Sequence, residues 1–164
     1  MNTQRYPVRV ATLADIAEIV RITNSAYLAE SFCIQGARTN EADVLQQMGN
    51  GQFVVIDNAQ ANTGAPALLG SVLWSISGER GYLGMLAVDP QAQGQGLARI
   101  LIGAVEQRCP AADCRYLELT VINLREELFP FYSAFGFTRV STLPFPAPEK
   151  ITQPLHLVQM RKLL

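Results

Sequence analysis

The stretch between Gly84 and Arg108 constrains the fold more than any other, because a glycine-rich loop joins two different hydrophobic patterns there. An apolar run of strand type, 85–88, leads into Asp89 and Pro90, which end a strand because proline fixes φ and lacks an N–H. After the glycines, apolar residues recur with the spacing of an amphipathic helix, at positions 97, 100, 101, 104 and 105. The stretch therefore predicts a strand, a glycine loop and a helix.

The glycine loop predicts an anion-binding site and consists of Gln93, Gly94, Gln95, Gly96, Leu97, Ala98 and Arg99. The first N–H groups of a helix lack intrahelical partners and carry a partial positive charge, and glycines let the backbone approach an anion closely. A P-loop is excluded, because Leu97 and Ala98 stand where it requires Lys and then Ser or Thr. The dinucleotide fingerprint is disfavoured, because Arg99 replaces its third glycine or alanine. An ordinary glycine-rich turn before a core helix is the alternative.

Hydrophobic patterns along the rest of the chain predict a mixed α/β order, β-α-α-β-β-β-α-β-α-β-β. The expected helices begin near residues 16, 41 and 97, and a short fourth one ends at 135–136. The expected strands cover residues 8–11, 52–57, 68–76, 82–88, 117–121, 137–141 and 155–160.

Composition narrows the class of protein. The chain has 164 residues, 49% of them hydrophobic and 16% charged, which suits one globular domain over residues 1–164. The net charge of −1 and the lack of a Lys/Arg cluster argue against nucleic acid or an anionic membrane as a main partner. The three cysteines, Cys33, Cys109 and Cys114, show no metal-ligand spacing, and neither a signal peptide nor a membrane-length apolar run is visible. We expect a cytoplasmic protein without a metal site.

The segment 93–98 resembles the Gln/Arg-x-x-Gly-x-Gly/Ala signature of the GNAT superfamily of N-acetyltransferases, with Gln93, Gly96 and Ala98 at its fixed positions. The element order is similar to that of the family from about residue 8 to residue 160. The resemblance implies a single α/β domain in which a mixed central sheet of about seven strands, with a splayed central strand pair, is flanked by about four helices. It also implies that the glycine loop binds the pyrophosphate of acetyl-CoA.

The resemblance implies three further donor contacts. Tyr132, in a Tyr-x-x-x-Gly-Phe motif, would protonate the departing thiolate of coenzyme A, although a purely packing role is the alternative. The backbone of Leu86, Ala87 and Val88 would pair with the pantetheine amides, unless that strand is fully paired within the sheet. Asn123 would contact the pantetheine arm. Its spacing to the tyrosine is longer than is usual in the family, and a turn-forming asparagine is the alternative.

Four residues lie where the family builds its acceptor side: Glu30, Phe32, Arg38 and Thr39. Residues 30–39 and 123–128 resemble a GNAT subgroup with Glu-x-Phe-x-x-x-Gly-x-Arg-Thr and Asn-Leu-Arg-x-Glu-Leu, and that resemblance implies no substrate. A solvated loop is the alternative for each residue. Glu30 is the one acid we place near the reacting groups, because the strand 82–88 carries no carboxylate. We expect ordered water to deprotonate the acceptor, with Glu30 assisting, and we expect His156 to be structural.

These observations together indicate an acetyl-CoA-dependent N-acetyltransferase that acts directly on a primary amine of a small molecule or peptide. A non-catalytic acyl-CoA-binding or sensing module is the alternative, and Tyr132 favours the enzyme. A redox nucleotide-binding protein is disfavoured by Arg99 and by the strand order. The sequence is compatible with a monomer and with a homodimer.

Overall fold

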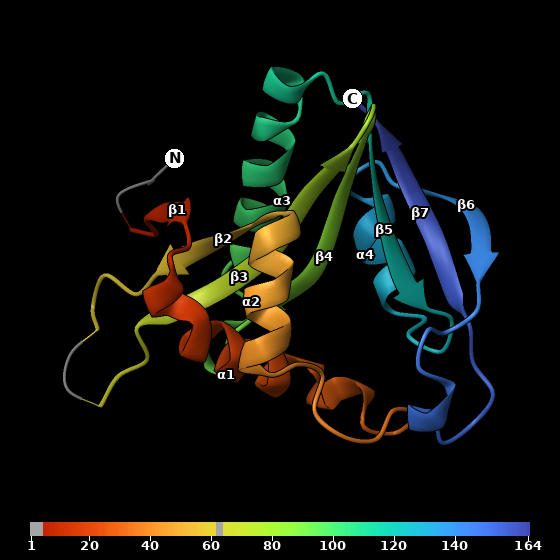
Figure 1. Ribbon diagram of the computed structural model, residues 1–164, viewed down its shortest axis with the longest axis horizontal. Helices are drawn as coiled ribbons and strands as arrows, with labels where there is room; N and C mark the ends of the chain where they lie inside the picture. The colour runs from red at the N-terminus through yellow and green to blue at the C-terminus, as the bar shows by residue number, and fades with distance from the viewer. Residues whose placement is uncertain (1–4, 62–63) are drawn as a thin grey trace.

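A mixed β-sheet forms the centre of the computed structural model, which describes residues 5–61 and 64–164 (Figure 1). Within the described residues the sheet has seven strands in the order β1-β2-β3-β4-β5-β7-β6, and only β4 and β5 are parallel neighbours. The mixed α/β order predicted from the sequence is confirmed. The strands are β1 Val8–Val10, β2 Gln52–Asp57, β3 Leu68–Ser77, β4 Arg80–Val88, β5 Tyr116–Ile122, β6 Thr138–Leu143 and β7 Leu157–Leu163.

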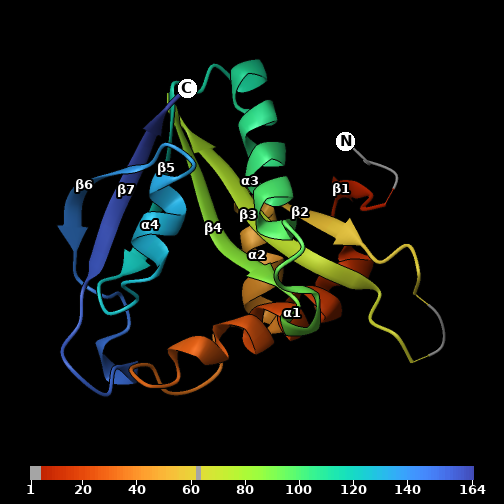
Figure 2. The same cartoon turned by 180° about the vertical axis from the view of Figure 1, so that it is seen from behind.

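Helices cover both faces of the sheet. The described chain has four α-helices, α1 Ile16–Ala26, α2 Glu41–Asn50, α3 Leu97–Arg108 and α4 Leu128–Ser133. α1 and α2 lie on one face of β2 to β4, whereas α3 and α4 lie on the opposite face, with α4 next to β5 and β7 (Figure 2). Each face has its own buried apolar layer, which includes Ile19 and Ile22 of α1 on one face and Leu101 and Ile102 of α3 on the other. No helix of the described residues is long and apolar enough to span a membrane.

Ion pairs fix the start of the chain to the sheet. The guanidinium of Arg9 on β1 binds the carboxylates of Asp15 and Asp57, each at 2.8 Å, while Asp15 also accepts the N–H of Thr12 to cap the turn before α1.

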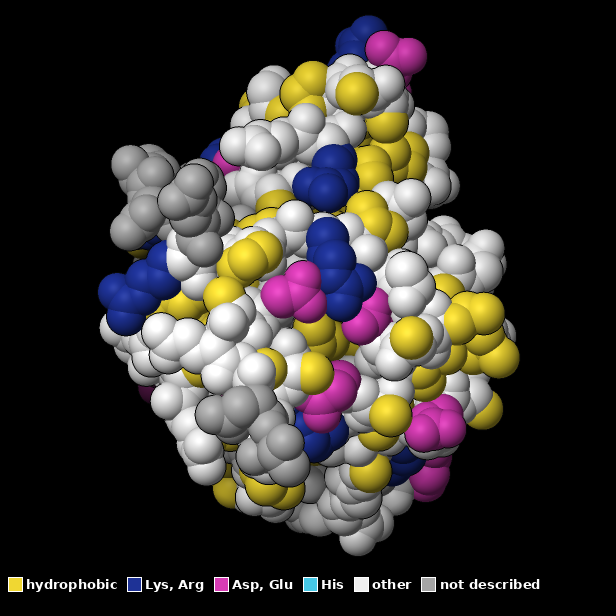
Figure 3. Space-filling view, turned by 90° about the vertical axis from the view of Figure 1, so that its left-hand side faces the viewer, with side chains coloured by type: hydrophobic (Ala, Val, Ile, Leu, Met, Phe, Trp, Pro, Cys, Tyr) yellow, Lys and Arg dark blue, Asp and Glu magenta, His cyan; other side chains and the backbone are white. Residues whose placement is uncertain are grey.

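The face seen in Figure 3 shows basic and acidic side chains interleaved, without a large patch of one sign. This distribution agrees with the charge balance of the sequence.

Several element boundaries differ by a few residues from the sequence-based prediction, and two of them concern candidate site regions. α4 ends at Ser133 rather than at 135–136, and Gly136, with φ +96°, completes the turn that follows. The last strand begins at Leu157 rather than at 155, so His156 precedes it and is exposed. At His156 a side chain takes the place of the neighbouring strand, because the carbonyl oxygen of the Asn123 side chain accepts the backbone N–H of His156 at 2.8 Å.

The central strand pair is splayed, as the sequence resemblance implied. β4 and β5 pair only from Arg80 to Tyr82 on β4 and from Tyr116 to Glu118 on β5, and they diverge beyond (Figure 1). Met85 has φ +50°, and two residues of β4 oppose one of β3 at this point, which makes a β-bulge. The bulge bends β4, and its edge from residue 83 to residue 88 has no pairing with β5.

Candidate active site

The glycine loop presents unpartnered backbone donors at the start of α3. Gly94 and Gly96 have φ of +82° and +79°, conformations that favour glycine, and a Cβ at either position would meet nothing within 4 Å. The first bond of the helix runs from the Ile100 N–H to the Gly96 carbonyl at 3.2 Å. No described residue accepts the backbone N–H groups of residues 93–99. These donors, with the positive end of a helix behind them, fit an anion such as a pyrophosphate.

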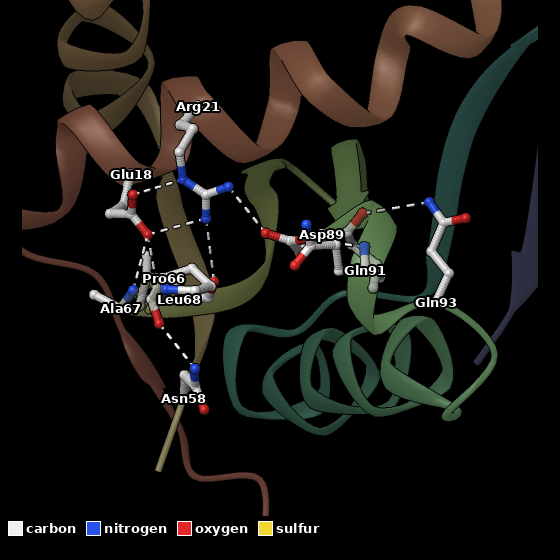
Figure 4. A network of polar contacts seen from close by, with 10 residues as sticks. Glu18, Arg21, Asn58, Pro66, Ala67, Leu68, Asp89, Gln91 and Gln93 are labelled. Carbon is white, nitrogen blue, oxygen red and sulfur yellow. Dashed lines mark hydrogen bonds and ion pairs between the residues drawn. The ribbon is translucent and has the colours of Figure 1, made fainter. Parts of the chain in front are cut away.

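A polar network ties the entrance of this loop to α1 (Figure 4). The carboxylate of Asp89, only 4% exposed, accepts from Arg21 of α1 and from the N–H of Gln91, each at 2.9 Å. Arg21 also binds Glu18 at 2.7 Å, and the Gln93 side-chain amide donates to the Val88 carbonyl at 3.4 Å. The end of β4 is therefore fixed to the opposite layer before the glycines begin.

Tyr6 is a contact of the glycine loop that the sequence did not suggest. Its hydroxyl donates to Oε1 of Gln95 at 2.5 Å, and its ring packs against the apolar layer that contains α3. The guanidinium of Arg5 lies 5.4 Å from the centre of the Tyr6 ring. The described N-terminal residues thus border the donor side of the site.

Tyr132 is buried in α4 and makes edge-to-face contacts with Phe131 at 5.0 Å and Phe137 at 6.0 Å between ring centres. Both the packing and the functional alternatives considered for this residue are therefore compatible with its position. Burial, and then the neighbouring Tyr27, raise the pKa of Tyr132 well above its ordinary value. The phenol is consequently protonated at neutral pH and suited to donate a proton.

Glu30 ends the 3-10 turn Tyr27–Glu30 that extends α1, and its carboxylate is 9% exposed. Arg125 binds it at 2.9 Å and also binds Glu127 at 2.6 Å. Burial raises the pKa of Glu30, and the charges of Arg125 and Arg38 counteract that rise. Arg38 is thus an electrostatic neighbour of Glu30, and Arg125, from the segment before α4, binds Glu30 directly.

Tyr27, Tyr82 and Arg125 are electrostatic neighbours of Tyr132 and were not among the predicted site residues. Burial raises the pKa of Tyr27 to about 12, and the guanidinium of Arg38 lies 5.2 Å from the centre of its ring. Arg125 is the third residue of the Asn-Leu-Arg motif, so this motif could have indicated Arg125 as a site residue. Tyr27 and Tyr82 have no distinguishing pattern in the sequence, because isolated tyrosines in a helix and a strand resemble ordinary packing residues.

Thr39 and Phe32, which the sequence predicts for the acceptor side, differ in how they are held. The backbone N–H and carbonyl of Thr39 are both bound by the Asn24 side chain, at 3.0 and 3.1 Å, and its hydroxyl donates to Asp43 at 2.6 Å. The side chain of Phe32 is 50% exposed, and its carbonyl accepts from the side chains of residues 152 and 153. Thr39 is therefore an anchor of this segment, while Phe32 stands at its surface.

The loop after α1 is joined to the loop before β7. A bridge pairs Ile34 with Ile151, and the Gln35 N–H donates to the Lys150 carbonyl at 2.9 Å. Figure 2 shows these two connections meeting at the end of the sheet where β4 and β5 lie farthest apart. The acceptor segment is thus braced from both halves of the chain.

The remaining candidate residues lie at the margins of the splay. Asn123 follows β5, and the carbonyl oxygen of its side chain accepts the backbone N–H of His156. Asn123 also borders a pocket of about 510 Å³ between α4 and β6. Its role toward the cofactor stays a prediction. At the closed end, Glu118 is 2% exposed and bound by Arg80 and Arg161, at 3.5 and 3.2 Å. Because two guanidinium groups hold this carboxylate, it is a poor candidate for a base.

Comparisons with known proteins agree with this arrangement. Residues 30–164 match the family model described as the acetyltransferase (GNAT) domain. No curated protein matches the sequence significantly.

Several solved structures share the fold. Ard1 from Thermoplasma volcanium has a TM-score of 0.77 at 18% identity, over 98% of each chain. The ribosomal-protein-S18-alanine N-acetyltransferase from Escherichia coli has a TM-score of 0.74 at 15% identity, over 96% of this chain and 93% of that one. The yncA protein from Salmonella typhimurium, solved with its cofactor acetyl-CoA, has a TM-score of 0.72 at 18% identity, over 98% of this chain and 94% of that one. With the family model spanning residues 30–164, the chain belongs to the GNAT family of acetyltransferases, which use acetyl-CoA as the acetyl donor.

Proposed function

We propose that this enzyme transfers the acetyl group of acetyl-CoA directly to a primary amine, at the splay between β4 and β5. One observation carries the proposal. Tyr132 comes from α4 on one face of the sheet, yet Tyr27 and Glu30, which come from the opposite face, are electrostatic neighbours of its hydroxyl. The divergence of β4 and β5 brings groups from both faces together. Donor-side and acceptor-side residues therefore meet where two substrates could react.

The donor side would hold acetyl-CoA mainly through backbone groups. The N–H groups of residues 93–99 would bind the pyrophosphate, because they face no other acceptor within the described chain. The backbone of Leu86, Ala87 and Val88, unpaired toward β5, would bind the pantetheine amides as an added strand does. Asn123 uses its side-chain carbonyl for His156, so its NH2 group would be the part that reaches the pantetheine arm.

Tyr132 would act as the general acid. Its raised pKa keeps the hydroxyl protonated, and the thiolate of coenzyme A needs a proton as the carbon–sulfur bond breaks. Glu30 would assist the opposite step, in which the acceptor ammonium loses a proton to ordered water. Its carboxylate lies beside the reacting region but is bound by Arg125, so it contributes negative charge more than a free proton acceptor.

Direct transfer is favoured over a covalent enzyme intermediate by the state of the thiols. Cys33, Cys109 and Cys114 are all buried. Burial raises the pKa of Cys33, and it raises the pKa of Cys109 to about 12. Buried protonated thiols are poor nucleophiles, because the thiolate is the attacking form.

The test is a screen for acetyl-CoA-dependent thiol release over a library of amines, combined with calorimetry of acetyl-CoA binding. We expect thiol release with at least one class of amine, and mass spectrometry should find one acetyl group on the product and none on the protein. Binding of acetyl-CoA without release for any amine would instead favour the acyl-CoA-binding module. An acetylated cysteine that forms at the rate of turnover would contradict direct transfer.

A further inference from the structure

One cation of the acceptor side is left without an anionic partner. Arg38 makes no hydrogen bond or ion pair with any residue of 5–61 or 64–164, and its guanidinium is placed over the ring of Tyr27 at 5.2 Å. Arg125, the other arginine of the cluster, is bound by both Glu30 and Glu127. The two arginines thus differ in role, since Arg125 is neutralised within the protein and Arg38 is available to a ligand.

The backbone that carries Arg38 is held in place. The side chain of Asn24 on α1 binds both the N–H and the carbonyl of the next residue, Thr39, at 3.0 and 3.1 Å. Thr39 is 5% exposed, and its hydroxyl is fixed by Asp43 of α2 at 2.6 Å. With this anchor on one side and the Tyr27 ring below it, the guanidinium loses little freedom when a ligand binds.

The position of Arg38 links the surface to the reacting region. Tyr27, on which Arg38 is stacked, opens the same 3-10 turn that ends at Glu30. Tyr27 is in turn an electrostatic neighbour of Tyr132. A molecule bound at Arg38 would therefore extend toward Glu30 and the general acid.

We propose that Arg38 binds a carboxylate of the acceptor, and that the acceptor is a small amino-carboxylic acid of the α-amino acid type. This inference rests on the proposed acetyl transfer and names its substrate class. A guanidinium matches a carboxylate through two parallel hydrogen bonds, while Glu30 attracts the ammonium of the same molecule. The cationic Arg38 and the anionic Glu30 belong to one segment of the chain, which favours an acceptor that carries an anionic and a cationic group close together.

The reaction balances without another reactant. The amine nitrogen, deprotonated by water, forms a bond to the acetyl carbon as the carbon–sulfur bond breaks. The sulfur leaves as the thiol of coenzyme A with the proton of Tyr132. The second proton of the nitrogen restores the Tyr132 hydroxyl, so the products are an N-acetyl amino acid and coenzyme A.

The experiment compares matched probes, L-amino acids and their α-carboxamides, in the wild type and in Arg38→Gln. We expect the wild type to prefer the acids by about 10- to 100-fold in kcat/KM, the range expected for one charge-assisted contact. Arg38→Gln should lose most of that preference, with a large fall in kcat/KM for the acids and only a small fall for the carboxamides. Arg115→Gln is the matched control, because Arg115 pairs with Glu79 at the closed end of the splay and should leave the preference intact.

Two outcomes would overturn the inference alone. One is an equal loss for acids and carboxamides in Arg38→Gln, which would assign Arg38 to folding or to general binding. The other is acetylation of polyamines or peptide N-termini with no preference for a carboxylate. Failure of the wild type to acetylate any amine, with acetyl-CoA still bound in calorimetry, would instead overturn the proposed function itself.

Discussion

The proposed donor side and the proposed acceptor side of this site are built from different parts of the chain. The donor side uses backbone, namely the free N–H groups of residues 93–99 and the unpaired edge of β4. The acceptor side uses side chains, namely Glu30, Arg38 and Arg125, held by contacts from distant segments. A backbone site suits a donor that never changes, because its N–H groups depend on the conformation of the two glycines and not on side-chain chemistry, whereas the side-chain site can be altered to suit a new acceptor.

The difference also concerns how each side is kept rigid. The glycine loop is fixed at its entrance by Asp89 and Arg21, and it begins a helix of the core. The acceptor segment is fixed by the Asn24–Thr39 contact and by its bridge to residue 151. Variants that act on one side alone should therefore separate donor binding from acceptor selectivity, and the variants below test that separation.

The largest expected effect is that of Tyr132→Phe, the residue where the two sides meet. Loss of a general acid typically lowers the rate by ~10²–10⁴, while acetyl-CoA affinity should be unchanged because the ring still packs. Single-turnover rates with saturating substrates, alongside calorimetry, make the measurement. Turnover equal to that of the wild type would return Tyr132 to a packing role.

The next effect is expected for Gly96→Asp on the donor side. A carboxylate at this position would face the pyrophosphate, and we expect acetyl-CoA affinity to fall about 100-fold, since juxtaposed like charges cost several kcal/mol. Gly96→Asn is the matched control, because asparagine tolerates the positive φ and the Cβ has open space around it. Equal affinities for the two variants would remove the charge argument and with it the anion site.

The donor side could be predicted from sequence because its parts are neighbours in the chain. A strand, two glycines and an amphipathic helix follow one another within 84–108, and the structure places them as the patterns indicate. The splay and the strand order followed from the family resemblance rather than from the residues alone. The bulge at Met85 had no signal, because methionine rarely adopts positive φ and neighbouring strands impose it.

The acceptor side was predicted only in outline. Glu30 and Arg38 belong to one predicted segment, and their roles stay predictions, but Arg125 lies 95 positions away from Glu30, and no local pattern indicates that pair. The contact of Tyr6 with Gln95 spans 89 positions and was missed for the same reason. Such ion pairs and hydrogen bonds depend on the tertiary packing of several elements, which hydrophobic periodicity does not encode.

A moderate effect is expected for Glu30→Gln on the acceptor side. Loss of its charge should lower kcat/KM for the acceptor by about 10-fold, as for one hydrogen bond or charge contact, with acetyl-CoA affinity retained. Glu127→Gln is the control, because Glu127 shares Arg125 but is exposed. The lower activity should be accompanied by unchanged circular dichroism.

The pH profile of Glu30→Gln separates the two possible bases. The pKa of Glu30 is raised, so an essential Glu30 base would make activity increase as pH rises through a value above its ordinary 4.5, and this limb would disappear in the variant. An acceptor amine that loses its proton to water gives an alkaline limb of its own, which persists. We expect the alkaline limb in both proteins, and its loss in the variant would identify Glu30 as the base.

The smallest effect is expected for Tyr6→Phe, which tests whether the N-terminal residues belong to the donor side. The change removes one hydroxyl, the donor to Oε1 of Gln95, and keeps the ring that packs beside α3. A neutral hydrogen bond contributes about 0.5–1.5 kcal/mol, so acetyl-CoA affinity should fall about 2- to 10-fold while kcat at saturation and acceptor KM stay unchanged. Because Gln95 is the partner, Gln95→Leu should cause a similar loss, and the double variant should lose no more than either single one. Additive losses, or a fall in acceptor kcat/KM that equals the fall in acetyl-CoA affinity, would mean that Tyr6 does not act through the glycine loop.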